Sequence, residues 1–145
     1  MKKIFIASDH AGFDLKSFIL NKKFNGFYNI NDIGCHSKNS CDYPDYANDL
    51  CLSMKKLEDS MGILICGTGI GMSIAANRHS HIRAALCTNI KMVSLSRMHN
   101  NSNVLCLGSN IINEEESIKC IETFIKTDFS NEERHIRRIS SISKN

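Results

Sequence analysis

The residue types best suited to chemistry in this chain are a cysteine and three alternating glycines, in the segment Cys66-Gly67-Thr68-Gly69-Ile70-Gly71. An apolar run at 63–65 precedes them and predicts a buried strand, and residues 73–76 after them predict a helix. Glycines let the backbone approach a ligand closely, and the first turn of a helix leaves N–H groups without intrahelical partners. The segment therefore predicts an anion-binding turn whose field also favours the Cys66 thiolate.

The glycine spacing by itself has competing explanations. It reads GxGxG rather than the GxGxxG of dinucleotide-binding turns, and it follows the third apolar run rather than the first. No acidic residue follows at the distance needed to hold a ribose hydroxyl, so a nicotinamide cofactor is disfavoured. A tight strand-to-helix turn is the structural alternative for the glycines, and a core position is the alternative for Cys66.

Two pairs of polar residues stand directly before predicted helices. Asp9 and His10 follow the first apolar run, and Asp42 and Tyr43 precede Pro44, a residue common at the start of helices. Asp9 has an alternative role as a helix cap, and Asp42-Tyr43 has one as a turn. In their functional interpretation all four line the rim of a ligand crevice.

Two further candidate groups lie in the second half of the chain. His99 and Asn100 fall in the polar segment 97–103, which we expect to connect a helix to a strand and in which polar side chains ordinarily serve the turn. Arg134 and Arg138 are four residues apart, so a helix puts both on one side, in the geometry for binding one phosphate. A solvent-exposed helix face is the alternative for these arginines.

Composition limits the classes of protein to consider. The 145 residues suit one domain, 1–145, and a net charge of +3 is too small to argue for a nucleic-acid partner. No Asp or Glu occurs between positions 61 and 113, which favours an anionic small ligand. The seven cysteines include no CxxC pair, so neither a disulfide framework nor a zinc site is indicated, and we expect a reducing, cytoplasmic setting. No apolar run suits a membrane-spanning helix or a signal peptide.

Strand and helix patterns alternate along the chain. Apolar runs at 4–7, 28–33, 61–66, 84–87 and 104–107 are separated by helical patterns, which predicts an α/β fold: a single doubly wound domain of Rossmann or flavodoxin type, with a five-stranded parallel sheet and helices on both faces. The first helix is expected at 13–23, and a second after Pro44. Asn113 with Glu116, and Ser130 with Glu133, predict two more helix starts, the last a basic helix near 131–140 before a fraying tail at 140–145. If the first and third strands are neighbours, Asp9, His10 and Cys66 face one another.

Taken together, these motifs resemble ribose-5-phosphate isomerase type B, a family that includes the galactose-6-phosphate isomerase subunits. The resemblance extends over nearly the whole chain and rests on residues 8–13, 42–44, 66–78, 97–100, 103–105 and 108–109, in order and at the family's spacing. It implies interconversion of D-ribose 5-phosphate and D-ribulose 5-phosphate, a step of the pentose phosphate pathway, without metal or cofactor. It also implies a homodimer with active sites shared between subunits, with a tetramer as a further assembly.

The resemblance implies a role for each candidate residue. Cys66 moves a proton between C2 and C1, Thr68 assists proton exchange between the two oxygens, and His99 opens the furanose ring with Asp9 or Asp42 as its partner. The other residues bind substrate: Tyr43 and Asn100 the sugar, Gly67, Gly69, Ile70 and Gly71 the enediolate, and His10, Arg134 and Arg138 the phosphate, the two arginines reaching in from the other subunit.

One position departs from the family's pattern. The family usually has an arginine after Gly108-Ser109, where this chain has Asn110, and losing one charge-assisted contact costs about 1–3 kcal/mol of phosphate binding. Two alternative functions stay open. The first is isomerisation of a six-carbon aldose phosphate, such as allose or galactose 6-phosphate. The second is a regulator that binds a phosphorylated metabolite without turnover, against which the presence of both Cys66 and His99 argues.

Overall fold

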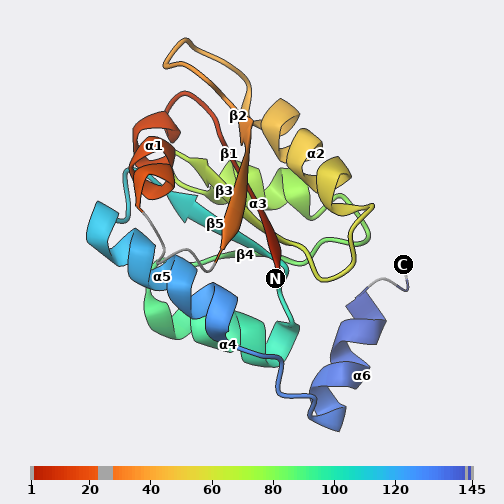
Figure 1. Ribbon diagram of the computed structural model, residues 1–145. Helices are drawn as coiled ribbons and strands as arrows, with labels where there is room; N and C mark the ends of the chain where they lie inside the picture. Colours follow the sequence, from red (N-terminus) through yellow and green to blue (C-terminus); the bar gives the residue numbers. More distant parts are fainter. Residues whose placement is uncertain (1, 23–27, 143, 145) are drawn as a thin grey trace.

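The protein, described by a computed structural model over residues 2–22, 28–142 and 144, contains a five-stranded parallel sheet with helices on both faces (Figure 1). The strands are β1 (Lys3–Ser8), β2 (Asn29–Gly34), β3 (Met61–Cys66), β4 (Ala84–Leu86) and β5 (Val104–Gly108). Their order in the sheet is β2-β1-β3-β5-β4, with all pairings parallel. The predicted α/β fold is therefore confirmed.

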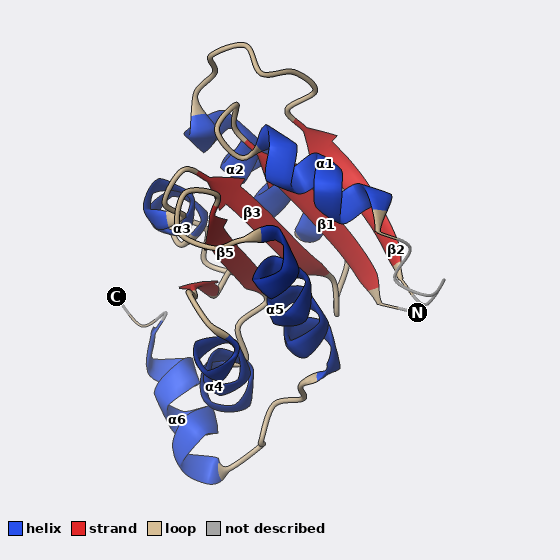
Figure 2. Cartoon of the chain, turned by 90° about the vertical axis from the view of Figure 1, so that its left-hand side faces the viewer, coloured by secondary structure: helices blue, strands red, loops and turns tan. Residues whose placement is uncertain are grey.

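Six helices complete the described part of the chain. They are α1 (Phe13–Asn21), α2 (Tyr43–Met54), α3 (Ile70–Ala76), α4 (Ile90–Asn100), α5 (Glu114–Lys126) and α6 (Glu133–Ile142). Helices α1, α4 and α5 pack together over one face of the sheet, and α2 and α3 pack together over the other. Figure 2 shows α6 lying beside α4 and outside both layers, so α6 packs mainly against α4.

The strand order brings the chemically interesting loops together. Strands β1 and β3 are neighbours, in register from Ile4 opposite Met61 to Ser8 opposite Ile65, as the crevice hypothesis required. In the five-stranded order of flavodoxin the last two strands are sequential, whereas here β5 lies between β3 and β4. Consequently the loops that follow β1, β3 and β5 share the carboxyl edge of the sheet.

The sheet core explains why β3 can position a reactive group. All six residues of β3 are buried, because helices cover both of its faces. Alternate side chains contribute to two separate clusters: Ile63 and Ile65 pack with α1 and α5, and Leu64 and Cys66 pack with α2 and α3. Cys66 is thus the last residue of a rigid central strand, on the α2–α3 side.

Several predicted boundaries need correction. Helix α1 ends at Asn21, and the predicted end at Lys23 lies outside the described residues. The segment 97–103 is not all loop, because α4 continues through His99 to Asn100 and only then turns, with Asn101 in the left-handed region at φ 44°. Left-handed asparagine ends helices as glycine does. Polar residues at a helix end and in a loop look alike in sequence.

The two predicted capping signatures behave differently. Asn113 accepts a hydrogen bond from the Glu116 N–H at 2.8 Å, as predicted. Ser130 instead accepts from the N–H of Glu132, at 3.3 Å, so the last helix begins at Glu133 rather than near 131. It also continues to Ile142, into the tail that was expected to fray, of which residues 143 and 145 lie outside the described chain. None of the helices described combines the length and apolar character needed to cross a bilayer.

Candidate active site

The loops after β1 and β3 are joined by backbone hydrogen bonds. The Asp9 N–H donates to the carbonyl of Ile65 at 3.2 Å, and the Cys66 carbonyl accepts from the Ser109 N–H at 2.8 Å. Asp9 is buried, and its carboxylate accepts a hydrogen bond at 3.0 Å from the N–H of Gly12, the residue directly before α1. Asp9 is not the cap residue of α1, because Gly12 occupies the N-cap position without a side-chain capping bond, but the contact with the Gly12 N–H fixes the carboxylate next to the end of β3.

Cys66 differs from the other buried cysteines in having a polar partner from the glycine loop. Its sulfur accepts a hydrogen bond from the Gly69 N–H at 3.1 Å, and the residue is 5% exposed. Such a donor orients the sulfur and stabilises negative charge on it when the thiol gives up its proton. By contrast, burial in the apolar core raises the pKa of Cys51 to about 12 and that of Cys106 well above its ordinary value. Cys51 and Cys106 are therefore structural cysteines of the core.

The glycines of the loop allow close packing against fixed groups. Gly69 lies in the left-handed region at φ +78°, and a Cβ there would come within 2.6 Å of a Leu86 methyl. A Cβ on Gly71 would lie 2.5 Å from the ring of Tyr43, so the tyrosine rests directly on the loop. The Thr68 hydroxyl accepts from the Ile70 N–H at 3.2 Å, which leaves the hydroxyl proton available to donate.

His10 is held in a defined tautomer by the loop that precedes α2. The Cys41 N–H donates to His10 Nδ1 at 3.2 Å, so Nδ1 is an acceptor and the neutral ring carries its proton on Nε2. The first part of this loop is itself anchored, because the buried Lys16 ammonium donates to the Cys35 carbonyl at 2.6 Å and pairs with Asp32. The exposed Asp42 begins α2 without a side-chain capping bond, so its carboxylate stays at the rim.

Asn110 lies beside the glycine loop. Its N–H donates to the Gly67 carbonyl at 2.9 Å, and its side-chain amide nitrogen would be 3.2 Å from a Cβ on Gly67. The position where the family usually has arginine is therefore at the glycine loop. We call the group formed by Asp9, His10, Tyr43, residues 66–71 and Asn110 the carboxyl-edge cluster.

The remaining candidates form a second group, which we call the helix cluster: His99, Asn100, Arg134 and Arg138. Helix α4 runs from the end of β4 back to the start of β5, so its last residues, His99 and Asn100, lie at the amino edge of the sheet. Cys66 ends β3 at the carboxyl edge. The structure of one chain therefore does not bring His99 to Cys66.

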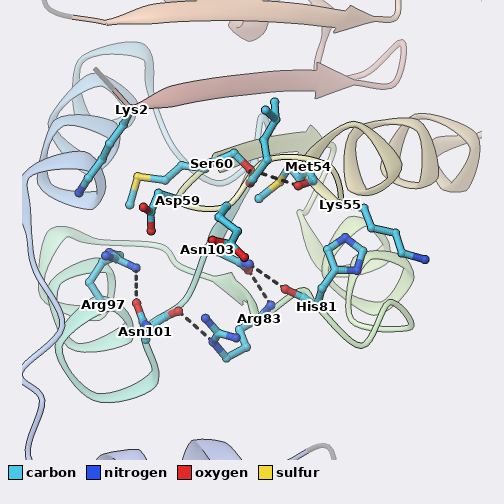
Figure 3. A pocket seen from close by; sticks show the side chains of 13 residues that line it. Lys2, Met54, Lys55, Asp59, Ser60, His81, Arg83, Arg97, Asn101 and Asn103 are labelled. Carbon is cyan, nitrogen blue, oxygen red and sulfur yellow. Dashed lines mark hydrogen bonds between the residues drawn. The ribbon is translucent and has the colours of Figure 1, made fainter.

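Arg97 and Arg83 hold the end of α4 in place. The buried Arg97 donates to the carbonyls of Thr127 and Ser102, at 3.0 and 2.5 Å, and Arg83 donates to those of Asn100 and Asn101. These groups border a cavity of about 270 Å³ at the amino edge (Figure 3). Neither Cys66 nor His99 lines it, and its arginines serve backbone carbonyls. We therefore assign this cavity a structural part in fixing α4.

Sequence reasoning gave His135, the neighbour of Arg134, no place in the site. It is 5% exposed, and its ring stacks on that of His99, with centroids 4.4 Å apart and planes at 15°. Arg134 and Arg138 are exposed, and Arg134 donates to Glu132 at 3.0 Å. The missed signal was helical spacing, since a residue next to Arg134 points about 100° away from the face that both arginines share.

Within the described residues no group of three or more His, Cys, Asp or Glu side chains could hold a metal ion. The carboxyl-edge cluster has instead a thiol, a carboxylate, an imidazole and backbone N–H groups at a helix start. These can move protons and stabilise an oxyanion.

Comparison with known proteins agrees with this chemistry. The family described as Ribose/Galactose Isomerase matches residues 4–142. The ribose-5-phosphate isomerase B of Escherichia coli is 38% identical over 99% of this chain and 95% of its own. The crystal structure of the Thermotoga maritima ribose 5-phosphate isomerase is 46% identical, with a TM-score of 0.94 over 99% of both chains. That of the Mycoplasma genitalium isomerase B with bound ribulose-5-phosphate is 40% identical, with a TM-score of 0.91 over 98% of this chain and 94% of that one.

Proposed function

Because the chain belongs to the ribose/galactose isomerase family, we propose that it interconverts D-ribose 5-phosphate and D-ribulose 5-phosphate through an enediolate. The observation that carries this proposal is the Cys66 sulfur at the end of β3, held by the Gly69 N–H beside the glycine loop. Relatives that match more than 90% of this chain are named for this activity, and the crystal structure of one of them contains ribulose-5-phosphate.

In this reaction Cys66 is the base. Its thiolate removes the proton from C2 of the open-chain aldose, and the electron pair moves to the carbonyl oxygen to give the enediolate. The thiol then returns the proton to C1, while the Thr68 hydroxyl relays the other proton between O1 and O2. Backbone N–H groups of the loop from Gly67 to Gly71 stabilise the oxyanion, and each such donor is worth about 3 kcal/mol in the transition state.

The other residues open and hold the sugar. His99 protonates the ring oxygen of the furanose, and Asp9 or Asp42 accepts the proton of the anomeric hydroxyl. Tyr43 and Asn100 position the chain of hydroxyl groups. His10, whose Nε2–H points away from its bond to Cys41, donates to the phosphate together with Arg134 and Arg138.

These roles require two copies of the chain. Cys66 and His99 lie at opposite edges of the sheet, yet both must reach one sugar phosphate. A homodimer that sets the helix cluster of one protomer against the carboxyl-edge cluster of its partner meets this requirement with two equivalent sites. Exposed apolar residues such as Ile70 and Ile74 on α3 would be covered by such contact.

Mixing two inactive variants tests this arrangement. Cys66→Ala damages the carboxyl-edge cluster and His99→Asn damages the helix cluster, so a mixed dimer keeps one site with both side chains intact. After the two variants are unfolded and refolded together, we expect about a quarter of wild-type turnover, because about half of random dimers are mixed and each has one good site. Recovery no greater than the sum of the separate variants would exclude a shared site.

Substrate choice is tested separately, with wild-type protein. We expect the highest kcat/KM on ribose 5-phosphate, compared with allose 6-phosphate and galactose 6-phosphate. A higher value for either six-carbon sugar would replace the proposed substrate while leaving the role of Cys66 unchanged. Binding of these phosphates without turnover of any of them would contradict an isomerase altogether.

A further inference from the structure

His135, which has no role in the proposed reaction, stacks its ring on that of His99. The two rings are 15° from parallel with centroids 4.4 Å apart. His135 is the buried residue of α6, and the other side chains of that helix are exposed or half-buried. The ring of His135 is therefore the buried contact between the helix that carries Arg134 and Arg138 and the helix that carries His99.

The connection before α6 is fixed at the same point. The Ser130 N–H donates to the Met98 carbonyl at 3.1 Å, one residue before His99. Apart from this bond and the histidine stack, α6 lies outside the layers of the fold (Figure 1). Movement of the His135 ring would therefore shift His99 and the arginines together.

The polar atoms of His135 do not explain its burial. Its Nε2 has no hydrogen-bond partner within the described residues, and the nearest carboxylate oxygen, from Glu132, is 4.0 Å away. Glu132 is engaged at 3.0 Å by Arg134 instead. The face of the His135 ring, rather than its nitrogens, makes the contact that the structure shows.

We propose that His135 is a positioning residue: its ring sets the plane of the His99 imidazole and docks α6, so that the ring-opening acid and the phosphate-binding arginines are placed as one unit. The inference rests on the proposed function. Since Nε2 of His135 has no hydrogen-bond partner within the described residues, a ring of similar shape without nitrogens should serve as well.

Two substitutions of His135 separate the ring face from the nitrogens. His135→Phe keeps a flat ring that can stack, whereas His135→Ala removes it. We expect the alanine variant to lose about tenfold or more in kcat/KM for ribose 5-phosphate, and the phenylalanine variant to stay within about threefold of wild type. Ser141→Ala, an exposed change on the same helix, is the matched control and should be silent. Equal losses in both His135 variants would show that the nitrogens matter and would overturn the proposal.

A second readout distinguishes positioning from general damage. Exchange of the C1 hydrogen of ribulose 5-phosphate with deuterium from heavy water needs Cys66 and the enediolate but no ring opening. With saturating ketose, we expect exchange by the alanine variant to stay within about threefold of wild type while turnover of ribose 5-phosphate falls. Exchange that falls in parallel with turnover would make His135 a general structural residue and overturn the proposal. If wild-type protein catalyses neither reaction, the proposed function itself fails.

Discussion

The carboxyl-edge cluster and the helix cluster are built in opposite ways. In the first, Cys66 ends β3 and Asp9 directly follows β1, and hydrogen bonds with the backbone groups of Ile65, Ser109 and Gly69 hold these two residues on several sides. In the second, His99 ends one helix, and the arginines lie on another that is attached mainly by one histidine stack. The group proposed as the base thus belongs to the rigid core, whereas the proposed ring-opening acid His99 and the proposed phosphate-binding arginines stand on a peripheral helix pair.

This difference shows where precision is needed. A base must approach a carbon-bound proton within a few tenths of an ångström, and a rigid strand end provides that accuracy. A phosphate can be held by long arginine side chains that adjust to it. A loosely attached helix is sufficient for that task, and in the proposed dimer the partner's surface would complete its support.

The largest expected effect comes from removing the base. Cys66→Ala should lower kcat by about 10²–10⁴-fold without loss of fold, because a positioned proton-transfer group contributes about that much. Steady-state turnover measures kcat, and the melting temperature shows whether the fold is kept. Cys106→Ala, which also shortens a buried cysteine of the same core cluster, serves as the control and should leave kcat nearly unchanged. Comparable kcat losses in both variants would mean that Cys66 is only a core residue.

The glycine loop provides the next largest effect and tests how rigid the carboxyl edge is. Gly69→Ala forces a side chain into the left-handed region and against Leu86 and the Leu107 backbone, which should cost about 1–3 kcal/mol of unfolding free energy. Gly67→Ala meets the movable amide of Asn110 at 3.2 Å and the Ala11 methyl at an ordinary contact distance of 3.9 Å, and should cost less. Urea unfolding compares the two, and equal losses would contradict the packing described for Gly69.

Restoring the family's arginine should strengthen phosphate binding at the rigid edge. Asn110→Arg adds a charge-assisted donor beside the glycine loop, and we expect KM for ribose 5-phosphate to fall about threefold to tenfold with little change in kcat. Asn110→Lys provides the charge without the planar fork and should give a smaller effect. An unchanged KM at low salt would show that position 110 does not reach the phosphate.

The smallest effect concerns pH at the helix cluster. Burial, His99 and the neighbouring Arg134 and Arg138 lower the pKa of His135 from its ordinary value of 6.5, with Glu132 opposing them. The unfolded chain therefore takes up this proton more readily, so the contribution of His135 to stability is complete above pH 6.5 and decreases as pH falls through that value. Wild-type protein should lose more melting temperature between pH 7.5 and 5.5 than His135→Phe. An equal decrease in melting temperature in both proteins would show that His135 does not cause this pH dependence.

Much of the fold and part of the site were predictable from local sequence patterns. The alternation of apolar runs with helical patterns correctly predicted five strands, and the strand before Cys66 was placed with its observed bounds. The family resemblance is likewise confirmed by the match over residues 4–142. These successes have one physical cause: burial periodicity, glycine turns and capping residues act over a few neighbouring positions, so the sequence displays them directly.

Tertiary structure alone decided which residues meet. The order of β4 and β5, the position of His99 at the edge opposite Cys66, the Cys41 bond to His10 and the His135 stack all join segments far apart in the chain or on different helices. No local pattern encodes such contacts, because they depend on how the sheet orders its strands and where each helix ends. The sequence by itself thus determined the elements and the position of the candidate base Cys66 at a strand end, and the packing of the sheet decided that the candidate residues lie in two separate clusters.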